Sequence, residues 1–434
     1  MKVLNLIGMG PGNPDLVTAQ ALNALKESDV IIGAKRAVMT ATESLERFGN
    51  QGENGQDMTC LKIYETFKTD EIISFIENHA EYERFSAVFT GDTSVYSGAI
   101  PLRKAIGEHL ALHPEMGPLE VRNIPGVSSI QYFLSKSGIS MADVRLVSLH
   151  GQARNLVPII RENKYTCVLL GEEDNVARIA DKLVQFGLTR VQITVGERLS
   201  YEDEHFTTDG PREMRKAVFD RLAIALFQND DYRVPIRSYG IAEEHFQRAN
   251  GVPITKRDVR ALSICRLALR KNSVVYDIGA GTGSVSIEAA LACPEGMVIS
   301  VEYDEDAAMT IERNRYDFKI DNVKVIRGMA PECIREMKGP DGEALPVPDS
   351  VFIGGSKGHI AEIVDWAVKA NPQVVIVINA ITLETIAEIL SIESRLTDYT
   401  FEMVEVHATS LERRGSYHMH QSENPITITR ISHR

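Results

Sequence analysis

The chain has 434 residues, of which 44% are hydrophobic and 25% are charged, a composition typical of soluble globular proteins. This length is too great for one ordinary hydrophobic core and predicts two domains of about 200 residues each. The net charge of −13 argues against a nucleic-acid substrate, because neutralising phosphates requires clustered Lys and Arg. No apolar run approaches the roughly 20 residues that a membrane span needs. The chain begins on an apolar run at Val3, which leaves no room for a signal peptide.

The five cysteines are scattered along the chain and never spaced as Cys-x-x-Cys. We therefore expect them to be reduced and mostly buried, which predicts a cytoplasmic protein.

A glycine-rich loop opens the chain. The apolar run 3–7 predicts a strand, and it is followed by Gly-Met-Gly-Pro-Gly at 8–12. Asn13 is a good N-cap and Pro14 a good first helical residue. The helix expected from there would bury four residues: Leu16, Ala19, Leu22 and Leu25. The prolines make the loop stiff, so it predicts a rigid wall beside a flat ligand, with a plain strand-to-helix turn as the alternative.

Apolar runs alternate with helical stretches through the rest of the first half, which predicts an α/β fold with parallel crossovers. The runs are 30–33, 87–92, 121–126, 144–150, 166–171, 191–196 and 222–227. Charge, proline and glycine then mix from Asn229 to about Gly251. This places a linker at 231–250, between a domain at 1–230 and a domain at 251–434.

A second glycine-rich loop lies in the second half, where an apolar run at 274–278 leads into Gly279, Gly281 and Gly283. The apolar residues after Ser284 predict a helix whose N-terminus faces a ligand. Glu302 ends the next apolar run, where a carboxylate can accept hydrogen bonds from ribose hydroxyls. A dinucleotide turn has a glycine where Ser284 stands, so the pattern favours S-adenosylmethionine over a nicotinamide cofactor. The alternative is a glycine turn without a ligand. Further apolar runs follow at 298–301, 323–326, 351–353 and 374–378.

Three cations lie within five residues just before this loop: Lys256, Arg257 and Arg260. In a helix, Lys256 and Arg260 share a face, which suits them to the carboxylates of an acidic substrate. The alternative is a solvated helix start, in which case Lys357, Arg413 and Arg414 are the next candidates. His418 and His420 lie two residues apart, but without a cysteine or carboxylate at ligand spacing they do not indicate a metal site.

The first half resembles the tetrapyrrole methylases. The resemblance lies in Gly-Met-Gly-Pro-Gly at 8–12, Gly-Ala-Lys-Arg at 33–36, Phe-Thr-Gly-Asp-Thr-Ser-Val-Tyr-Ser-Gly at 89–98 and Ile-Pro-Gly-Val-Ser-Ser at 124–129. Thr93 departs from the proline that many relatives carry there. The second half resembles the precorrin C15-methyltransferases that also decarboxylate, through Ile-Thr-Lys-Arg-Asp-Val-Arg at 254–260, the turn 277–283, and the stretches 327–332, 352–355 and 424–428. Together they cover almost the whole chain, in the order of the fused precorrin C(5,15)-methyltransferases of cobalamin biosynthesis.

The resemblance implies a two-lobed class III methyltransferase domain followed by a Rossmann-like class I methyltransferase domain, each binding one S-adenosylmethionine. It implies conversion of precorrin-6B, or its cobalt form, to precorrin-8 by methylation at C5 and C15 and decarboxylation of the C12 acetate. A homo-oligomer is expected. The cofactor residues it implies are Gly10, Gly91, Asp92, Val95, Ser128 and Ser129 in the first half, and Thr255, Gly279, Ala280, Gly281, Thr282, Gly283, Glu302 and Ala330 in the second.

Several alternatives stay open at this point. Asp92 could be an ordinary turn aspartate, and the two serines could cap a helix. No catalytic residue is identified, because methyl transfer needs mainly alignment and exclusion of water. An RNA methyltransferase would need a basic face, and a nicotinamide oxidoreductase would need a glycine at position 284. A nonenzymatic scaffold would have no need of the two glycine turns.

Overall fold

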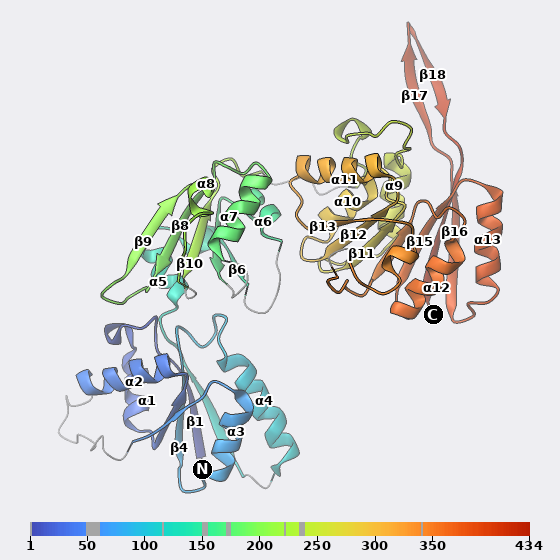
Figure 1. Cartoon of the computed structure of the whole chain (residues 1–434). Coiled ribbons are helices and arrows are strands. Elements are labelled where there is room, and N and C mark those ends of the chain that lie inside the picture. The colour runs from blue at the N-terminus through green and yellow to red at the C-terminus, as the bar shows by residue number, and fades with distance from the viewer. Residues whose placement is uncertain are drawn as a thin grey trace. The chain divides into compact units, whose positions relative to one another are not determined.

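The computed structural model describes residues 2–48, 61–114, 117–149, 155–170, 175–220, 223–233, 239–339 and 342–434. The chain forms two compact units (Figure 1). The first consists of Met1–Gln152, Lys164–Ala180 and Arg190–Asp230, and the second of Ala153–Asn163, Asp181–Thr189 and Asp231–Arg434. The domain and linker limits expected from the sequence stay a prediction.

The first unit begins with a parallel sheet whose strand order is β3-β2-β4-β1-β5. Its strands are β1 (Lys2–Gly8), β2 (Val30–Gly33), β3 (Lys62–Glu65), β4 (Arg84–Phe89) and β5 (Leu119–Ile124). The helices along this stretch are η1 (Pro14–Leu16), α1 (Ala19–Lys26), α2 (Lys35–Phe48), α3 (Thr69–Asn78) and α4 (Ala99–Leu112). Side chains of β1 alternate between two cores: Leu6 packs with α3 and α4, and Ile7 packs with α1 and α2. Helices therefore cover both faces, as a parallel sheet requires.

A second, mixed sheet follows in the first unit, with the order β6-β7-β10-β8-β9. Its strands are β6 (Val144–Ser148), β7 (Tyr165–Leu169), β8 (Gln192–Glu197), β9 (His205–Asp209) and β10 (Ile224–Gln228). The helices along this stretch are α5 (Ser129–Lys136), η4 (Met141–Asp143), α6 (Leu156–Glu162), α7 (Val176–Gln185) and α8 (Pro211–Met214). Of these, α6 and the last residues of α7 belong to the second unit.

The second unit is built on a seven-stranded sheet with the order β13-β12-β11-β14-β15-β19-β16. Its strands are β11 (Val274–Ile278), β12 (Met297–Glu302), β13 (Val323–Arg327), β14 (Ser350–Ile353), β15 (Val375–Ala380), β16 (Tyr399–Val406) and β19 (Ile426–His433). Its helices are η5 (Glu243–His245), α9 (Arg257–Arg266), α10 (Ser284–Ala292), α11 (Glu305–Asp317), η6 (Glu332–Ile334), α12 (Ile360–Ala370) and α13 (Leu383–Glu393). Val275 packs with α9, α10 and α11, while its neighbour Tyr276 packs with α12 and α13 on the other face.

Strands β11 to β15 of this sheet are parallel, and β19 joins antiparallel to β15. The carboxyl ends of β11, β12 and β14 therefore meet at one edge. Ligands of open α/β sheets bind at such an edge.

A two-stranded hairpin of β17 (Thr409–Arg414) and β18 (Tyr417–Ser422) extends away from this sheet (Figure 1). Every residue of both strands is exposed. The strand expected around His418 and His420 is present as β18.

The helix expected after Asn13 is divided in two. Asn13 caps the short η1, and Thr18 then caps α1. Val17 and Thr18 between them are extended, with ψ of 131° and 148°. The break shifts the helical register, so Ala21 is buried in α1 while Ala19 is exposed, contrary to the prediction.

Within the described residues, no helix combines the length and apolar character needed to cross a bilayer.

Candidate functional site

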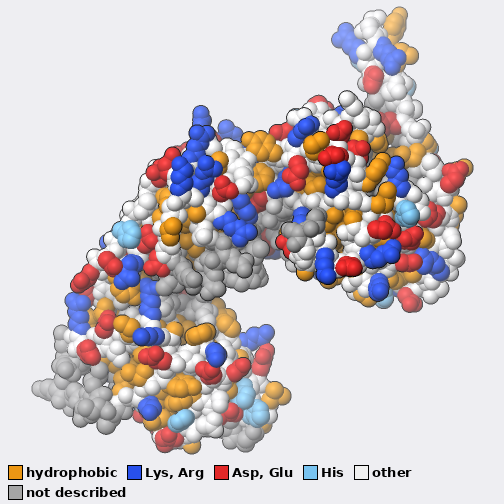
Figure 2. Space-filling model, in the orientation of Figure 1, with side chains coloured by type: hydrophobic (Ala, Val, Ile, Leu, Met, Phe, Trp, Pro, Cys, Tyr) orange, Lys and Arg blue, Asp and Glu red, His pale blue; other side chains and the backbone are white. Residues whose placement is uncertain are grey.

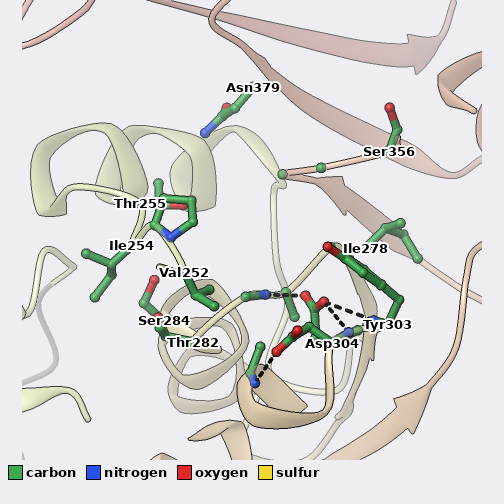
Figure 3. A pocket seen from close by; sticks show the side chains of 18 of the residues that line it. Val252, Ile254, Thr255, Ile278, Thr282, Ser284, Tyr303, Asp304, Ser356 and Asn379 are labelled. Atoms are coloured by element: carbon green, nitrogen blue, oxygen red, sulfur yellow. Dashed lines mark hydrogen bonds between the residues drawn. The ribbon is translucent and has the colours of Figure 1, made fainter. Parts of the chain in front are cut away.

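A cavity of about 740 Å³ lies in the second unit at the carboxyl edge of the sheet. It is bounded by the turn after β11, the ends of β12 and β14, and the segment 250–256 that precedes α9 (Figure 3). Its volume falls within the roughly 300–1,000 Å³ usual for small-molecule sites.

The glycine turn after β11 forms one side of the cavity. Gly279, Gly281 and Gly283 all have left-handed backbones, with φ of 67°, 58° and 77°. Of these, Gly279 and Gly281 line the cavity together with Ala280 and Thr282. Gly283 is outside the lining, and a Cβ added to it would lie 2.9 Å from Cγ2 of Ile311 on α11. Its absent side chain therefore serves helix packing, although the sequence predicted a cofactor contact.

Glu302 is 5% exposed at the end of β12 and lines the cavity. Its Oε2 accepts a hydrogen bond from Gly281 N at 2.7 Å, and its Oε1 accepts from Tyr303 N at 2.9 Å and Asp304 N at 3.0 Å (Figure 3). A carboxylate has about four acceptor positions. One position on Oε2 is therefore left for a ligand hydroxyl.

Asp277 lies beneath the turn and is fully buried. Its Oδ2 accepts from Ser286 Oγ, which in turn accepts from Ser300 Oγ at 2.7 Å. Burial raises the pKa of Asp277 to about 7, the Ser286 hydrogen bond opposes the rise, and the nearby charge of Glu302 adds to it. Asp277 is therefore harder to ionise than an exposed carboxyl.

The residues present fit a nucleoside-type cofactor. Thr282 lines the cavity, and its buried Oγ1 has no hydrogen-bond partner within the described chain. Thr255 and Ala330 line the cavity as well. The turn supplies close backbone approach, Glu302 an acceptor and Thr282 a hydroxyl.

Two of the six predicted cations line the cavity, and the other four lie outside its lining. Lys256 and Lys357 line the cavity. Lys256 Nζ lies 3.2 Å from Glu423 Oε1, and Lys357 Nζ lies 4.7 Å from the ring centroid of Tyr303.

The three predicted arginines other than Arg260 lie outside the cavity lining. Arg257 is exposed beside Asp258. Arg413 and Arg414 lie on the exposed strand β17.

Arg260 is a correction to the sequence analysis. Its side chain is fully buried and pairs with Glu288, with Nε 2.6 Å from Oε1. A guanidinium committed in this way is not available to a substrate carboxylate. Lys256 and Arg260 share no substrate face, because the helix begins at Arg257 and turns Arg260 into the core.

Sequence reasoning missed several polar residues that line the cavity: Tyr303, Ser356, Asn379, Glu423 and Asn424. Asn379 lies near the carboxyl end of β15, and its Oδ1 accepts from Ser263 Oγ at 3.0 Å. The signal available was its position at the end of the predicted run 374–378, where parallel strands present ligand contacts.

In the first unit, the loops after β1, β4 and β5 meet through backbone contacts. Gly10 and Gly91 form an antiparallel bridge, with N–O distances of 3.1 and 2.7 Å. A Cβ on Gly8 would lie 2.7 Å from the backbone of both Gly91 and Gly126. Small residues are therefore required here for the loops to pack.

Asp92 joins two of these loops. Its Oδ1 accepts from Ser94 N at 2.8 Å, and its Oδ2 accepts from Gly126 N at 3.0 Å. Burial opposes ionisation, but these hydrogen bonds outweigh it and lower the pKa of Asp92. Asp92 therefore has the structural role of a turn aspartate, which the sequence analysis gave as one alternative. Its role as a cofactor residue stays a prediction.

Ser128 caps α5 by accepting from Ile130 N at 3.2 Å, and Ser129 is the first residue of that helix. Val95 is half-buried against the cluster that contains Ile130. The predicted residues of the first unit thus lie on the three loops or at the helix that follows them.

Within the described part of the chain, no group of three or more His, Cys, Asp or Glu side chains is placed to hold a metal ion.

Comparison with known proteins finds a separate family match in each half of the chain. Residues 3–213 match the family of tetrapyrrole (corrin/porphyrin) methylases, and residues 245–433 match the precorrin methyltransferase domain. The chain is 37% identical over 196 residues to a probable cobalt-precorrin-6B C(15)-methyltransferase (decarboxylating) of Pyrobaculum calidifontis, covering 45% of this chain and 96% of that one. It is 31% identical over 296 residues to a precorrin-6Y C(5,15)-methyltransferase (decarboxylating) of Sinorhizobium, covering 67% and 69%. The solved precorrin-6Y C5,15-methyltransferase structure from Geobacter metallireducens is 34% identical, covers 45% and 97%, and has a TM-score of 0.41.

A glycine turn and a carboxylate at the edge of a parallel sheet, in a chain with these matches, define an S-adenosylmethionine-dependent methyltransferase. The chain belongs to the precorrin-6Y C(5,15)-methyltransferase (decarboxylating) family.

Proposed function

We propose that this chain is a bifunctional methyltransferase of cobalamin biosynthesis that converts precorrin-6B, or its cobalt form, to precorrin-8. It methylates C5 and C15 of the macrocycle and removes the carboxyl group of the C12 acetate. The observation that carries the proposal is that one chain contains two separate candidate sites. One is the cavity with its glycine turn and Glu302, and the other is the set of glycine loops around Asp92. Relatives of both halves carry names that include these reactions.

Each unit would bind one S-adenosylmethionine. We assign C5 methylation to a domain at 1–230, and C15 methylation and decarboxylation to a domain at 251–434. The predicted linker 231–250 connects them, and from Gly240 onward it is bound to the second unit. When bound, the cofactor supplies a methyl group on a positively charged sulfur, which electron-rich ring carbons can attack without a covalent enzyme intermediate.

The residues of the cavity in the second unit would bind and orient the cofactor and exclude water. Gly279 and Gly281 let the backbone approach the cofactor, Glu302 Oε2 accepts from a ribose hydroxyl, and Thr255 and Ala330 close over the ligand. Alignment of this kind supplies much of the rate in reactions that need no covalent step.

Decarboxylation requires a proton donor to the ring. Lys256, Tyr303 and Lys357 line the cavity, and each side chain bears an N–H or O–H group. We place the donor among these three.

Two other functions fit less well. An RNA methyltransferase would need a basic surface, whereas the net charge is −13 and acidic and basic side chains are interspersed over the visible face of the second unit (Figure 2). A nicotinamide oxidoreductase would have a glycine where Ser284, which is 2% exposed, begins α10.

We also propose that the protein is a homo-oligomer joined through the β17–β18 hairpin. An isolated two-stranded hairpin is marginally stable in water, yet this one exposes Leu411, Tyr417 and Met419. Glu412 and Arg414 lie on the face shared with Tyr417 and Met419, with a 3.9 Å ion pair between them. Such a face is complementary to a copy of itself about a two-fold axis. Sedimentation of the full chain, compared with Tyr417→Ser/Met419→Ser, should show loss of the oligomer; an unchanged mass would refute this interface.

A cytoplasmic location fits the cysteines, because Cys167 and Cys293 are buried free thiols.

Incubation of the purified chain with S-adenosylmethionine and either metal-free or cobalt-loaded precorrin-6B tests the function. Mass spectrometry should show a product that has gained two methyl groups and lost one carbon dioxide. An unchanged macrocycle in both incubations would refute the proposal.

A further inference from the structure

Two oppositely charged side chains are buried together beneath the wall of the cavity in the second unit. Arg260 on α9 and Glu288 on α10 form an ion pair with Nε 2.6 Å from Oε1, and their side chains are 0% and 1% exposed. Neither residue lines the cavity.

The remaining hydrogen bonds of the pair all go to one chain segment. Glu288 accepts from Gly240 N and from Ile241 N, both at 2.9 Å. Arg260 donates to the carbonyl oxygens of Ile241 and Thr255. The pair thus ties down both ends of the segment 240–255, which we call the connector.

Between these ends the connector packs against the pair and then forms the cavity wall. Phe246 is 5% exposed, with its ring centroid 4.9 Å from the Arg260 guanidinium. Val252, Ile254 and Thr255 line the cavity (Figure 3). The sequence had assigned most of this segment to a linker.

A second buried side chain links the connector to the glycine turn. Asn314 on α11 is fully buried. Its Oδ1 accepts from Gln247 N at 2.7 Å, and its Nδ2 donates to Thr282 O at 2.8 Å. Asn314 therefore holds the connector and the adjacent glycine turn together.

Stability alone does not account for a buried ion pair of this kind. Desolvation of two charges offsets much of their attraction, and apolar residues of similar volume often stabilise a fold equally well. What apolar residues cannot supply are the hydrogen bonds to Gly240, Ile241 and Thr255.

We propose that Arg260 and Glu288 are positioning residues for the second cofactor site. They hold the connector so that residues 250–256 contact S-adenosylmethionine, without touching the cofactor themselves. This inference rests on the cofactor site proposed above.

The test is the double variant Arg260→Met/Glu288→Leu in the full chain. It removes both charges together, so no unpaired charge is buried. The protein's single tryptophan, Trp366, is half-buried and packs against the core of the second unit, so its fluorescence follows the unfolding of that unit. Deuterium exchange of the peptide that contains 279–283, at increasing S-adenosylhomocysteine concentrations, gives the dissociation constant of the second site.

We expect the double variant to remain folded and to bind S-adenosylhomocysteine at the second site at least tenfold more weakly. The matched control is Asp365→Leu/Arg395→Met, which removes an exposed pair on the same unit and should keep wild-type affinity. Wild-type affinity in a folded Arg260→Met/Glu288→Leu chain would overturn the inference.

A second measurement decides the matter should the double variant not fold. In the wild-type chain, saturating S-adenosylhomocysteine should slow deuterium exchange of residues 250–256. Unchanged exchange there, with slowed exchange at 279–283, would overturn the positioning role. Exchange unchanged at both places in the wild type would instead refute the proposed cofactor site.

Discussion

Gly279 and Gly355 lie backbone against backbone at the edge of the cavity in the second unit. A Cβ added to Gly279 would lie 2.8 Å from Gly355 N and closer still to its carbonyl oxygen, and Gly279 has a φ of 67°. The turn after β11 and the end of β14 can therefore approach only without a side chain at position 279.

Gly279→Ala should consequently disturb this contact and weaken S-adenosylhomocysteine binding at the second site by tenfold or more. The substitution combines a steric clash with a left-handed backbone that alanine adopts reluctantly. Calorimetry would measure binding, and Trp366 fluorescence would report the stability of the second unit. Gly355→Ala is the control for stability, because a Cβ there meets no atom within 4 Å. Equal binding by wild type and Gly279→Ala would contradict the role given to the turn.

Asp277 should make the stability of the second unit depend on pH. Its pKa is about 7 in the fold against an ordinary 3.8, so the folded state holds this proton more tightly than the unfolded state. The associated stability is complete below the ordinary pKa and is lost as pH rises through the folded pKa. Asp277→Asn cannot ionise and retains an oxygen to accept from Ser286. Its unfolding temperature relative to wild type should therefore increase between about pH 4 and about pH 7. A difference that does not vary with pH would show that Asp277 ionises normally.

Lys256 should contribute to binding of the acidic macrocycle. One charge-assisted hydrogen bond is worth roughly 1.5–3 kcal/mol, and about 1.4 kcal/mol is a tenfold change in affinity. We expect Lys256→Met to raise the Michaelis constant of the second site for the tetrapyrrole at least tenfold, with cofactor affinity almost unchanged. Arg257→Met, one residue along but outside the cavity lining, should have a smaller effect. Steady-state kinetics in which the two variants behave alike would remove Lys256 from the substrate site.

The two sets of reactions should be separable by substitution. Glu302→Ala removes the acceptor beside the glycine turn and should abolish C15 methylation and decarboxylation while C5 methylation continues. Asp92→Ala releases Gly126 N and should weaken C5 methylation alone. Product masses measured with each domain's own substrate decide this. One substitution that silences all three events in a folded chain would refute the division of labour.

The parts of the fold that could be predicted from sequence are those with local signals. The central strands are continuous apolar runs, because helices cover both faces of each parallel sheet, and the glycine turn has a spacing that a backbone near a ligand requires. Strand β9, which is exposed along its whole length, carried no such signal. Strand β3, with three of its four residues exposed, carried none either.

The misassigned site residue, Arg260, shows a different limit. A sequence pattern places it on a helix beside Arg257, but its partner Glu288 lies 28 residues away. Only the packing of α9 on α10 shows that the cation faces the core. Lys256, the N-cap of α9, does line the cavity, and its role in binding substrate stays a prediction.

The central claim is that one chain holds two independent cofactor sites. Calorimetric titration of the full wild-type chain with S-adenosylhomocysteine tests it most directly. The account predicts close to two molecules bound per chain, falling to one in Glu302→Ala. It should also fall to one in Gly91→Val, which places a branched side chain on a backbone with a φ of 76°. A stoichiometry of one for the wild-type chain would contradict it.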